Sequence, residues 1–295
     1  MIYDVAIAGL GAMGSAIAAH CAARGASVVG LEQFGPANEL GSSSGKSRMI
    51  RKAYFEDPAY VPLLLRTYEL WHELEGESGE ELLQITGLLM VGKEDSEIIA
   101  GAHRAAREHN LPIESLSQRQ IEARYPTLQV HDGEVGVVEP DGGVLAPEQA
   151  IRAQLKKATI SGAELHFGVA MDKWHASEKG FDISLRDGSS ITARILVLAL
   201  GAWFKETLEA LRVSIRVQRN VQAWFTPGTS AYQASRFPPF LLDRAGLPAP
   251  LYGFPDFGDG VKAAFHSYGD LTNADHVERE ISMSRDIEPI AKAME

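Results

Sequence analysis

A glycine-rich hexapeptide near the N-terminus constrains the fold more than any other feature of the chain. Gly9-Leu10-Gly11-Ala12-Met13-Gly14 fits the pattern G-x-G-x-x-G. It directly follows the apolar run 3–8 and directly precedes an alanine-rich segment, 12–24, which stops at Gly25. A second apolar run, 28–31, ends at Glu32. This order of strand, helix and strand predicts the βαβ unit of a parallel sheet.

The position of the hexapeptide predicts a dinucleotide site of the Rossmann type. Gly9 would permit the tight turn, Gly11 would let a pyrophosphate approach the backbone, and Gly14 would let the helix pack closely on the sheet. The helix N-terminus would face the phosphates. Glu32 closes the second strand, where a carboxylate can accept hydrogen bonds from a ribose diol. The alternative is a tight turn without a ligand, and the motif alone does not separate FAD from NAD.

Composition narrows the range of partners. The net charge of −11 over 295 residues argues against nucleic acid or an anionic membrane as a partner, and favours a small-molecule substrate. A single cysteine, Cys21, excludes an internal disulfide framework. The longest apolar stretch, 195–200, is far shorter than the roughly 20 residues of a membrane span. We expect a cytoplasmic protein with no signal peptide, no transmembrane segment and no metal site.

The pattern along the chain predicts a mixed α/β (α+β) fold. We expect helices over 58–74, 97–109 and 147–161, the first with an apolar face of Val61, Leu64, Leu65, Tyr68 and Trp71. We expect strands over 87–92, 163–167 and 181–185, a buried strand over 191–200, and short antiparallel strands from residue 213 onward. The predicted FAD-binding domain comprises 1–82 and 145–212. The interleaved substrate domain, on a mostly antiparallel mixed sheet, comprises 83–144 and 213–295.

Two further clusters carry a resemblance to a known family. One is the stretch from Gly41 to Arg51, followed by Ala53-Tyr54 and Tyr60-Val61-Pro62. The other is Tyr252-Gly253-Phe254-Pro255, then Gly260-Val261-Lys262, then His266-Ser267-Tyr268-Gly269. Together with Thr86-Gly87, Glu139-Pro140, Gly143-Val144-Leu145 and Gly201-Ala202-Trp203, they make essentially the whole chain similar to monomeric sarcosine oxidases and N-methyltryptophan oxidases.

The resemblance implies FAD as cofactor and a role for each matching residue. Arg51 matches the arginine that binds the substrate carboxylate, Arg48 the arginine near the flavin, and Lys262 the lysine at the oxygen-reaction site. Tyr252 and His266 match side chains that border the substrate. The residues expected to contact the cofactor are Gly9, Gly11, Ala12, Met13, Gly14, Glu32, Gln33, Ser42, Ser43, Ser47, Arg48, Gly201 and Trp203.

Four of these residues also have an interpretation without function. Arg48 and Arg51 could form a solvated basic face, and Lys262 could be an exposed lysine on a strand. His266 could be a core histidine bonded to the backbone. Their occurrence together in the order of the family favours the functional reading.

The chain departs from the family pattern in two places. Ser43-Ser44 stands where the family has a pair of histidines. The family also continues past the position of Glu295, into a stretch that holds the cysteine bonded covalently to the flavin. Cys21 lies on the first helix, at the phosphate end of the cofactor, and cannot replace it. We therefore expect non-covalent FAD, and either a fragment of a longer protein or a truncated gene product.

The implied activity is oxidation of a secondary-amine amino acid such as sarcosine or another N-methyl amino acid. A hydride would pass from the carbon beside nitrogen to flavin N5, and oxygen would be reduced to hydrogen peroxide. The family favours a monomer. Two alternatives stay open: a truncated, non-catalytic FAD-binding remnant, and an NAD-linked dehydrogenase in which Arg48, Arg51 and Lys262 would have no assigned role.

Overall fold

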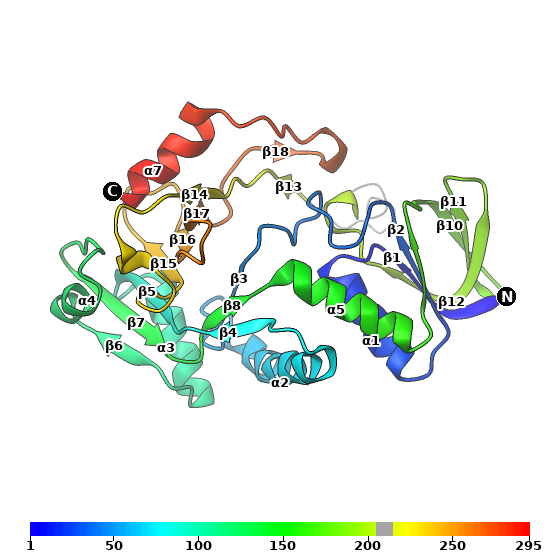
Figure 1. Cartoon of the computed structure of the whole chain (residues 1–295), viewed down its shortest axis with the longest axis horizontal. Coiled ribbons are helices and arrows are strands. Elements are labelled where there is room, and N and C mark those ends of the chain that lie inside the picture. The colour runs from blue at the N-terminus through cyan, green and yellow to red at the C-terminus, as the bar shows by residue number, and fades with distance from the viewer. Residues whose placement is uncertain (205–214) are drawn as a thin grey trace.

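A six-stranded sheet carries the N-terminal nucleotide motif. The computed structural model describes residues 1–204 and 215–295. The sheet has the order β10-β11-β12-β1-β2-β9, in which β12, β1, β2 and β9 run parallel and β10-β11-β12 antiparallel. Its strands are β1 (Ile2–Ala8), β2 (Val28–Glu32), β9 (Glu164–Phe167), β10 (Met171–Ser177), β11 (Gly180–Leu185) and β12 (Ser190–Leu198). Figure 1 shows this sheet at the end of the molecule that holds the N-terminus.

The predicted βαβ unit is confirmed. Helix α1 (Ala12–Ala23) follows β1 after the glycine turn, and its chain leaves through Gly25 at a φ of 84°. Helix α5 (Pro147–Ile160) packs on α1, and small residues such as Ala18 and Ala19 let the two helices approach closely. The apolar side chains of β1 and β2 complete this core, so the carboxyl end of β1 is held rigidly.

A seven-stranded sheet forms the other end of the molecule (Figure 1). Its order is β14-β17-β16-β15-β5-β7-β6, and every neighbouring pair is antiparallel except β15 with β5. The strands are β5 (Leu88–Lys93), β6 (Glu114–Leu116), β7 (Glu134–Glu139), β14 (Ala223–Phe225), β15 (Phe240–Asp243), β16 (Leu251–Phe254) and β17 (Val261–Phe265). Helices α3 (Glu97–His109) and α4 (Gln118–Arg124) pack on it. The mostly antiparallel mixed sheet is therefore confirmed.

A three-stranded sheet lies between the two larger sheets (Figure 1). Its strands are β3 (Arg48–Ile50), β8 (Gly143–Leu145) and β4 (Leu83–Ile85), with β8 in the middle. Helix α2 (Val61–Ser78) packs beside it through Tyr68 and Trp71. Because Arg48 is the first residue of β3 and Arg51 directly follows its last residue, this sheet positions the backbone of both predicted arginines.

Some sequence predictions are wrong in detail. The helix expected over 58–74 is a short 3₁₀ turn η1 (Pro58–Tyr60) followed by α2, and Leu65 on its expected apolar face is 40% exposed. The strand expected to be buried is β12, where Ile195 is 55% exposed because α1 packs on β1 and β2 instead. Strand β10 was not expected. The predicted domain boundary at 212/213 lies outside the described residues.

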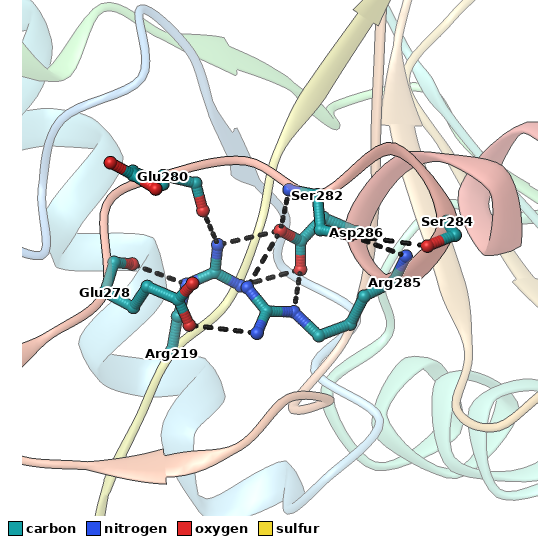
Figure 2. Close-up of polar contacts among 7 residues, drawn as sticks. All are labelled: Arg219, Glu278, Glu280, Ser282, Ser284, Arg285 and Asp286. Carbon is teal, nitrogen blue, oxygen red and sulfur yellow. Dashed lines mark hydrogen bonds and ion pairs between the residues drawn. The ribbon is translucent and has the colours of Figure 1, made fainter.

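The last described segment is fastened by a buried ion pair. Arg219 follows β13 (Val217–Gln218), which pairs with β18 (Leu271–Thr272). Its guanidinium donates to both carboxylate oxygens of Asp286, at 2.8 and 2.9 Å, and to the carbonyls of Glu278 and Glu280 (Figure 2). This contact holds a π-helical turn (Met283–Ile287) and helix α7 (Glu288–Met294) against the seven-stranded sheet. Among residues 1–204 and 215–295, no helix combines the length and apolar character that crossing a bilayer requires.

Candidate active site

A cavity of about 680 Å³ opens at the carboxyl ends of β1, β2 and β12. This is the edge at which parallel α/β sheets bind ligands. Ten of the residues expected to contact the cofactor line it: Gly9, Gly11, Ala12, Met13, Glu32, Gln33, Ser42, Ser43, Gly201 and Trp203. Gly14 lies beneath the turn, and Ser47 and Arg48 lie in a polar cluster that also contains Lys262.

The three glycines of the motif have different surroundings. A Cβ on Gly9 would lie 2.4 Å from the carbonyl oxygen of Ala199, and one on Gly14 would lie 1.8 Å from the carbonyl oxygen of Gly9. A Cβ on Gly11 would meet no protein atom within 4 Å. Gly9 and Gly14 are therefore required by the packing of the protein itself, whereas the space at Gly11 belongs to the cavity. That space, together with an α1 N-terminus without a side-chain cap, fits the pyrophosphate of a dinucleotide.

Glu32 ties the glycine turn to the end of β2. Its Oε2 accepts from the Leu10 N–H at 2.9 Å and its Oε1 from the Phe34 N–H at 3.0 Å, and the residue is only 7% exposed. The side chain nevertheless lines the cavity. Each carboxylate oxygen can accept a second hydrogen bond, so Glu32 can shape the turn and also bind a ribose diol.

Several residues that line the cavity were not expected from the sequence, among them the hydrogen-bond partner of the expected Trp203. Trp203 packs its ring edge against Phe34, with centroids 5.3 Å apart, and its Nε1 donates to Asp275 Oδ1 at 2.7 Å. Asp275 lies in the 3₁₀ turn η4 (Ala274–His276), far away in sequence. The stretch 169–172 and Arg186 also line the cavity. No local sequence pattern indicates that η4 or Arg186 lines the cavity, because only the folding of the chain brings them there.

A buried lysine connects the cavity to the segment that carries the arginines. Ser42 and Ser43 line the cavity, and the same loop continues to Ser47. Lys262 Nζ, from β17, donates to the carbonyls of Gly45 and Ser47, both at 2.8 Å, and to Ser47 Oγ at 3.0 Å. Its ammonium also lies 4.6 Å from the centre of the Phe254 ring. The reading of Lys262 as an exposed strand lysine is wrong, since the residue is 2% exposed.

Arg48 also binds this loop. Its Nη1 donates to the Ser47 carbonyl at 2.9 Å, and its Nη2 donates to the carbonyls of Ser42 and Ser44. Burial and, to a smaller extent, the nearby positive charge of Arg48 together lower the pKa of Lys262 to about 7. Near neutral pH, Lys262 can therefore exist with or without its extra proton.

Arg51 lies apart from this cluster and is paired with a carboxylate. Its Nη2 donates to Glu56 Oε1 at 2.7 Å and to Oε2 at 2.8 Å, and its guanidinium lies over the rings of Tyr54 and Phe55. The side chain is 12% exposed, which excludes a solvated basic face at this position. Arg51 Nε is buried without a hydrogen-bond partner among the described residues. The guanidinium can thus accept a carboxylate ligand at a cost of displacing Glu56.

Tyr252 and His266 lie next to each other on the seven-stranded sheet. Their ring centres are 6.5 Å apart, and the Tyr252 hydroxyl accepts from Gln222 Nε2 at 3.3 Å. Burial raises the pKa of Tyr252. The reading of His266 as a core histidine is wrong, because the residue is exposed. Gln222, which was not expected from the sequence, also approaches Gly45, so it joins Tyr252 to the loop of Lys262.

Comparison with known proteins places the chain in a family. A family model described as FAD dependent oxidoreductase matches residues 4–292. The chain belongs to this family. The chain is 41% identical over 284 residues to monomeric sarcosine oxidase from Streptomyces avermitilis, covering 95% of this chain and 73% of the relative. It is 32% identical over 273 residues to N-methyl-L-tryptophan oxidase from Yersinia pestis, covering 92% and 72%. The resemblance stated from the sequence is thereby confirmed.

Solved structures confirm the fold. NikD, described as an unusual amino acid oxidase essential for nikkomycin biosynthesis, superposes with a TM-score of 0.81 at 24% identity, covering 98% of this chain and 76% of NikD. Glycine oxidase from Geobacillus kaustophilus superposes with a TM-score of 0.76 at 21% identity, covering 96% and 74%. Within the described residues there is no group of three or more His, Cys, Asp or Glu side chains that could hold a metal ion.

Proposed function

We propose that this chain is an FAD-dependent oxidase of a secondary-amine amino acid, sarcosine or another N-methyl amino acid, with oxygen as electron acceptor and hydrogen peroxide as product. The observation that carries the proposal is Lys262, buried and bonded to Gly45 and Ser47 on the loop that also lines the cavity. A cation joined in this way to a dinucleotide cavity suits oxygen reduction. The sarcosine and N-methyl-L-tryptophan oxidases among its relatives support the substrate class.

The residues of the cavity suit FAD held without a covalent bond. Gly11 and the start of α1 would face the pyrophosphate, Glu32 a ribose diol, and Ser42 and Ser43 the segment leading toward Lys262. When bound, FAD accepts the electrons of the C–H bond beside the amine nitrogen and passes them to oxygen. The single cysteine, Cys21, lies on α1 among the apolar side chains packed between α1 and α5.

Arg51 is the proposed anchor for the substrate carboxylate. Its planar guanidinium now holds Glu56 through Nη2, and a substrate carboxylate of the same shape would take the place of Glu56. The buried Nε, which has no partner in the described residues, would then gain one. Tyr252 and His266 would border the amine.

Lys262 is the proposed cation for oxygen reduction. Its Nζ is fixed by three hydrogen bonds and shielded from water, so a proton on it would act on developing negative charge in a region of low dielectric. Because its pKa is lowered to about 7, the charged form is abundant only below that pH. Faster reoxidation at lower pH is the signature of this role.

A substrate panel tests the proposal. The purified chain is supplied with FAD and assayed for hydrogen peroxide with sarcosine, N-methyltryptophan, the matched primary amino acids, and N-methyl amines without a carboxylate. We expect peroxide only with N-methyl amino acids, one mole per mole of amine consumed. Peroxide from the carboxylate-free amines at equal rates would refute the amino-acid assignment. Bound FAD with no turnover of any amine would establish a non-catalytic remnant, and turnover only with NAD would establish a dehydrogenase.

A further inference from the structure

A carboxylate holds each end of the segment that carries Arg48 and Arg51. At the first end, Glu148 Oε1 accepts from the backbone N–H groups of Gly45 at 2.7 Å and Lys46 at 3.1 Å. At the second end, the two oxygens of Glu139 accept from the N–H groups of Lys52 and Ala53. Both arginines thus lie on a stretch, 45–53, whose ends are bound by side chains instead of by secondary structure alone.

Glu139 and Glu148 lie on either side of the same strand, β8. Glu139 ends β7 and Glu148 lies in the first turn of α5, while β8 between them pairs along β3. Glu139 is 1% exposed. Burying a carboxylate costs free energy unless hydrogen bonds compensate it, and both of its oxygens are matched to consecutive N–H groups. Burial accordingly raises the pKa of Glu139.

We propose that Glu139 and Glu148 are positioning residues with separate roles, Glu139 for Arg51 and Glu148 for Lys262. Lys52, which Glu139 binds, directly follows Arg51. Gly45, whose N–H Glu148 binds, accepts Lys262 Nζ on its carbonyl at 2.8 Å. One carboxylate thereby sets the guanidinium that meets the substrate, and the other sets the peptide that holds the ammonium. This inference rests on the proposed function.

Two variants separate the roles. Glu139→Gln replaces one of the two acceptor oxygens by an NH₂ group that cannot accept from a backbone N–H, whereas Glu148→Ala removes the single oxygen that accepts from both Gly45 and Lys46. In anaerobic titration and stopped-flow assays, we expect Glu139→Gln to weaken binding of sarcosine roughly tenfold and leave reoxidation by oxygen unchanged. We expect Glu148→Ala to slow reoxidation roughly tenfold and leave the sarcosine dissociation constant unchanged. Equal effects of both variants on both quantities would overturn the inference, since a merely structural role would not separate them.

Hydrogen exchange of backbone amides gives a readout independent of activity. Glu139→Gln should accelerate exchange at Lys52 and Ala53, and Glu148→Ala at Gly45 and Lys46, each without effect on the other pair. Unchanged exchange at all four amides would overturn the inference even in an active enzyme. If wild type is not reduced by any N-methyl amino acid, the proposed function fails and the exchange pattern still decides the contacts. Should Glu139→Gln not fold, Glu139→Asp withdraws the oxygens while keeping the charge and is expected to give the same selective loss of sarcosine binding.

Discussion

The different surroundings of the three motif glycines predict that one of them can be changed without damage to the protein. In Gly11→Ala, the new methyl group enters the cavity and meets no protein atom within 4 Å. We expect its cost to be about 0.5 kcal/mol, from a less favourable residue at the start of α1. In Gly14→Ala, the new carbon would lie 1.8 Å from a backbone oxygen of Gly9, which must move. Overpacking of that kind costs about 1 to 3 kcal/mol or more.

Although Gly11→Ala should cost little stability, we expect it to weaken FAD binding. The Gly11 methyl group occupies the space through which the pyrophosphate reaches the backbone, so we expect FAD affinity to fall at least about tenfold, or about 1.4 kcal/mol. The assay is urea unfolding of the apoprotein together with fluorescence titration of FAD, for wild type and both variants. A normal FAD affinity of Gly11→Ala would refute the assignment of the cavity. A Gly11→Ala apoprotein as unstable as the Gly14→Ala apoprotein would refute the distinction between the two glycines.

Three further predictions concern charged side chains. Lys262→Met should slow reoxidation of the flavin strongly, with little effect on its anaerobic reduction. In the wild type, the reoxidation rate should fall as pH rises through about 7, because Lys262 loses its positive charge there. Stopped-flow spectroscopy over a range of pH measures both rates, and equal slowing of both half-reactions in Lys262→Met would exclude the role. Arg51→Ala should weaken binding of an N-methyl amino acid by about 2 to 4 kcal/mol, and Arg51→Lys should weaken it by less. Binding of an amine without a carboxylate, measured in the same anaerobic titration, should not change. Equal losses of affinity for the acid and the amine would count against a carboxylate anchor. Asp286→Ala should destabilise the fold by about 2 kcal/mol because Arg219 loses its partner. Its hydrogen bonds to Arg219 hold the pKa of Asp286 well below its usual range, so this stabilisation is complete above the ordinary carboxyl pKa and is lost as pH falls further. Acid and urea unfolding curves of the two proteins test this, and an unchanged midpoint near neutral pH would contradict it.

The first part of the fold could be predicted because its determinants are local. The glycine turn between 9 and 14, the stop at Gly25 and the acidic end of β2 each follow from a few adjacent residues. Helix α3 could be read from its apolar spacing, and its predicted bounds of 97 and 109 match those observed. The exposure of Ile195 and Leu65 could not be predicted, because it depends on which neighbouring elements cover each face.

The site was predicted as a set of residues but not as a set of contacts. Motif order indicated Arg51 and Lys262, yet nothing in the sequence showed that Arg51 holds Glu56 or that Lys262 holds Ser47. Trp203 was expected near the cofactor, whereas its partner Asp275 comes from a turn that no motif marks. The contacts of Lys262 with Ser47 and of Trp203 with Asp275 join segments far apart in the chain, so they depend on the assembled fold and no local sequence pattern indicates them.

We propose that a flavin in this cavity is reduced by an N-methyl amino acid whose carboxylate Arg51 binds. The most direct measurement is the visible spectrum of the purified chain with FAD, recorded without oxygen before and after addition of sarcosine or N-methyltryptophan, and again after oxygen is admitted. We expect that the flavin band bleaches with at least one of these substrates and returns with oxygen, with one equivalent of hydrogen peroxide formed. A bound flavin whose spectrum no N-methyl amino acid changes would contradict it.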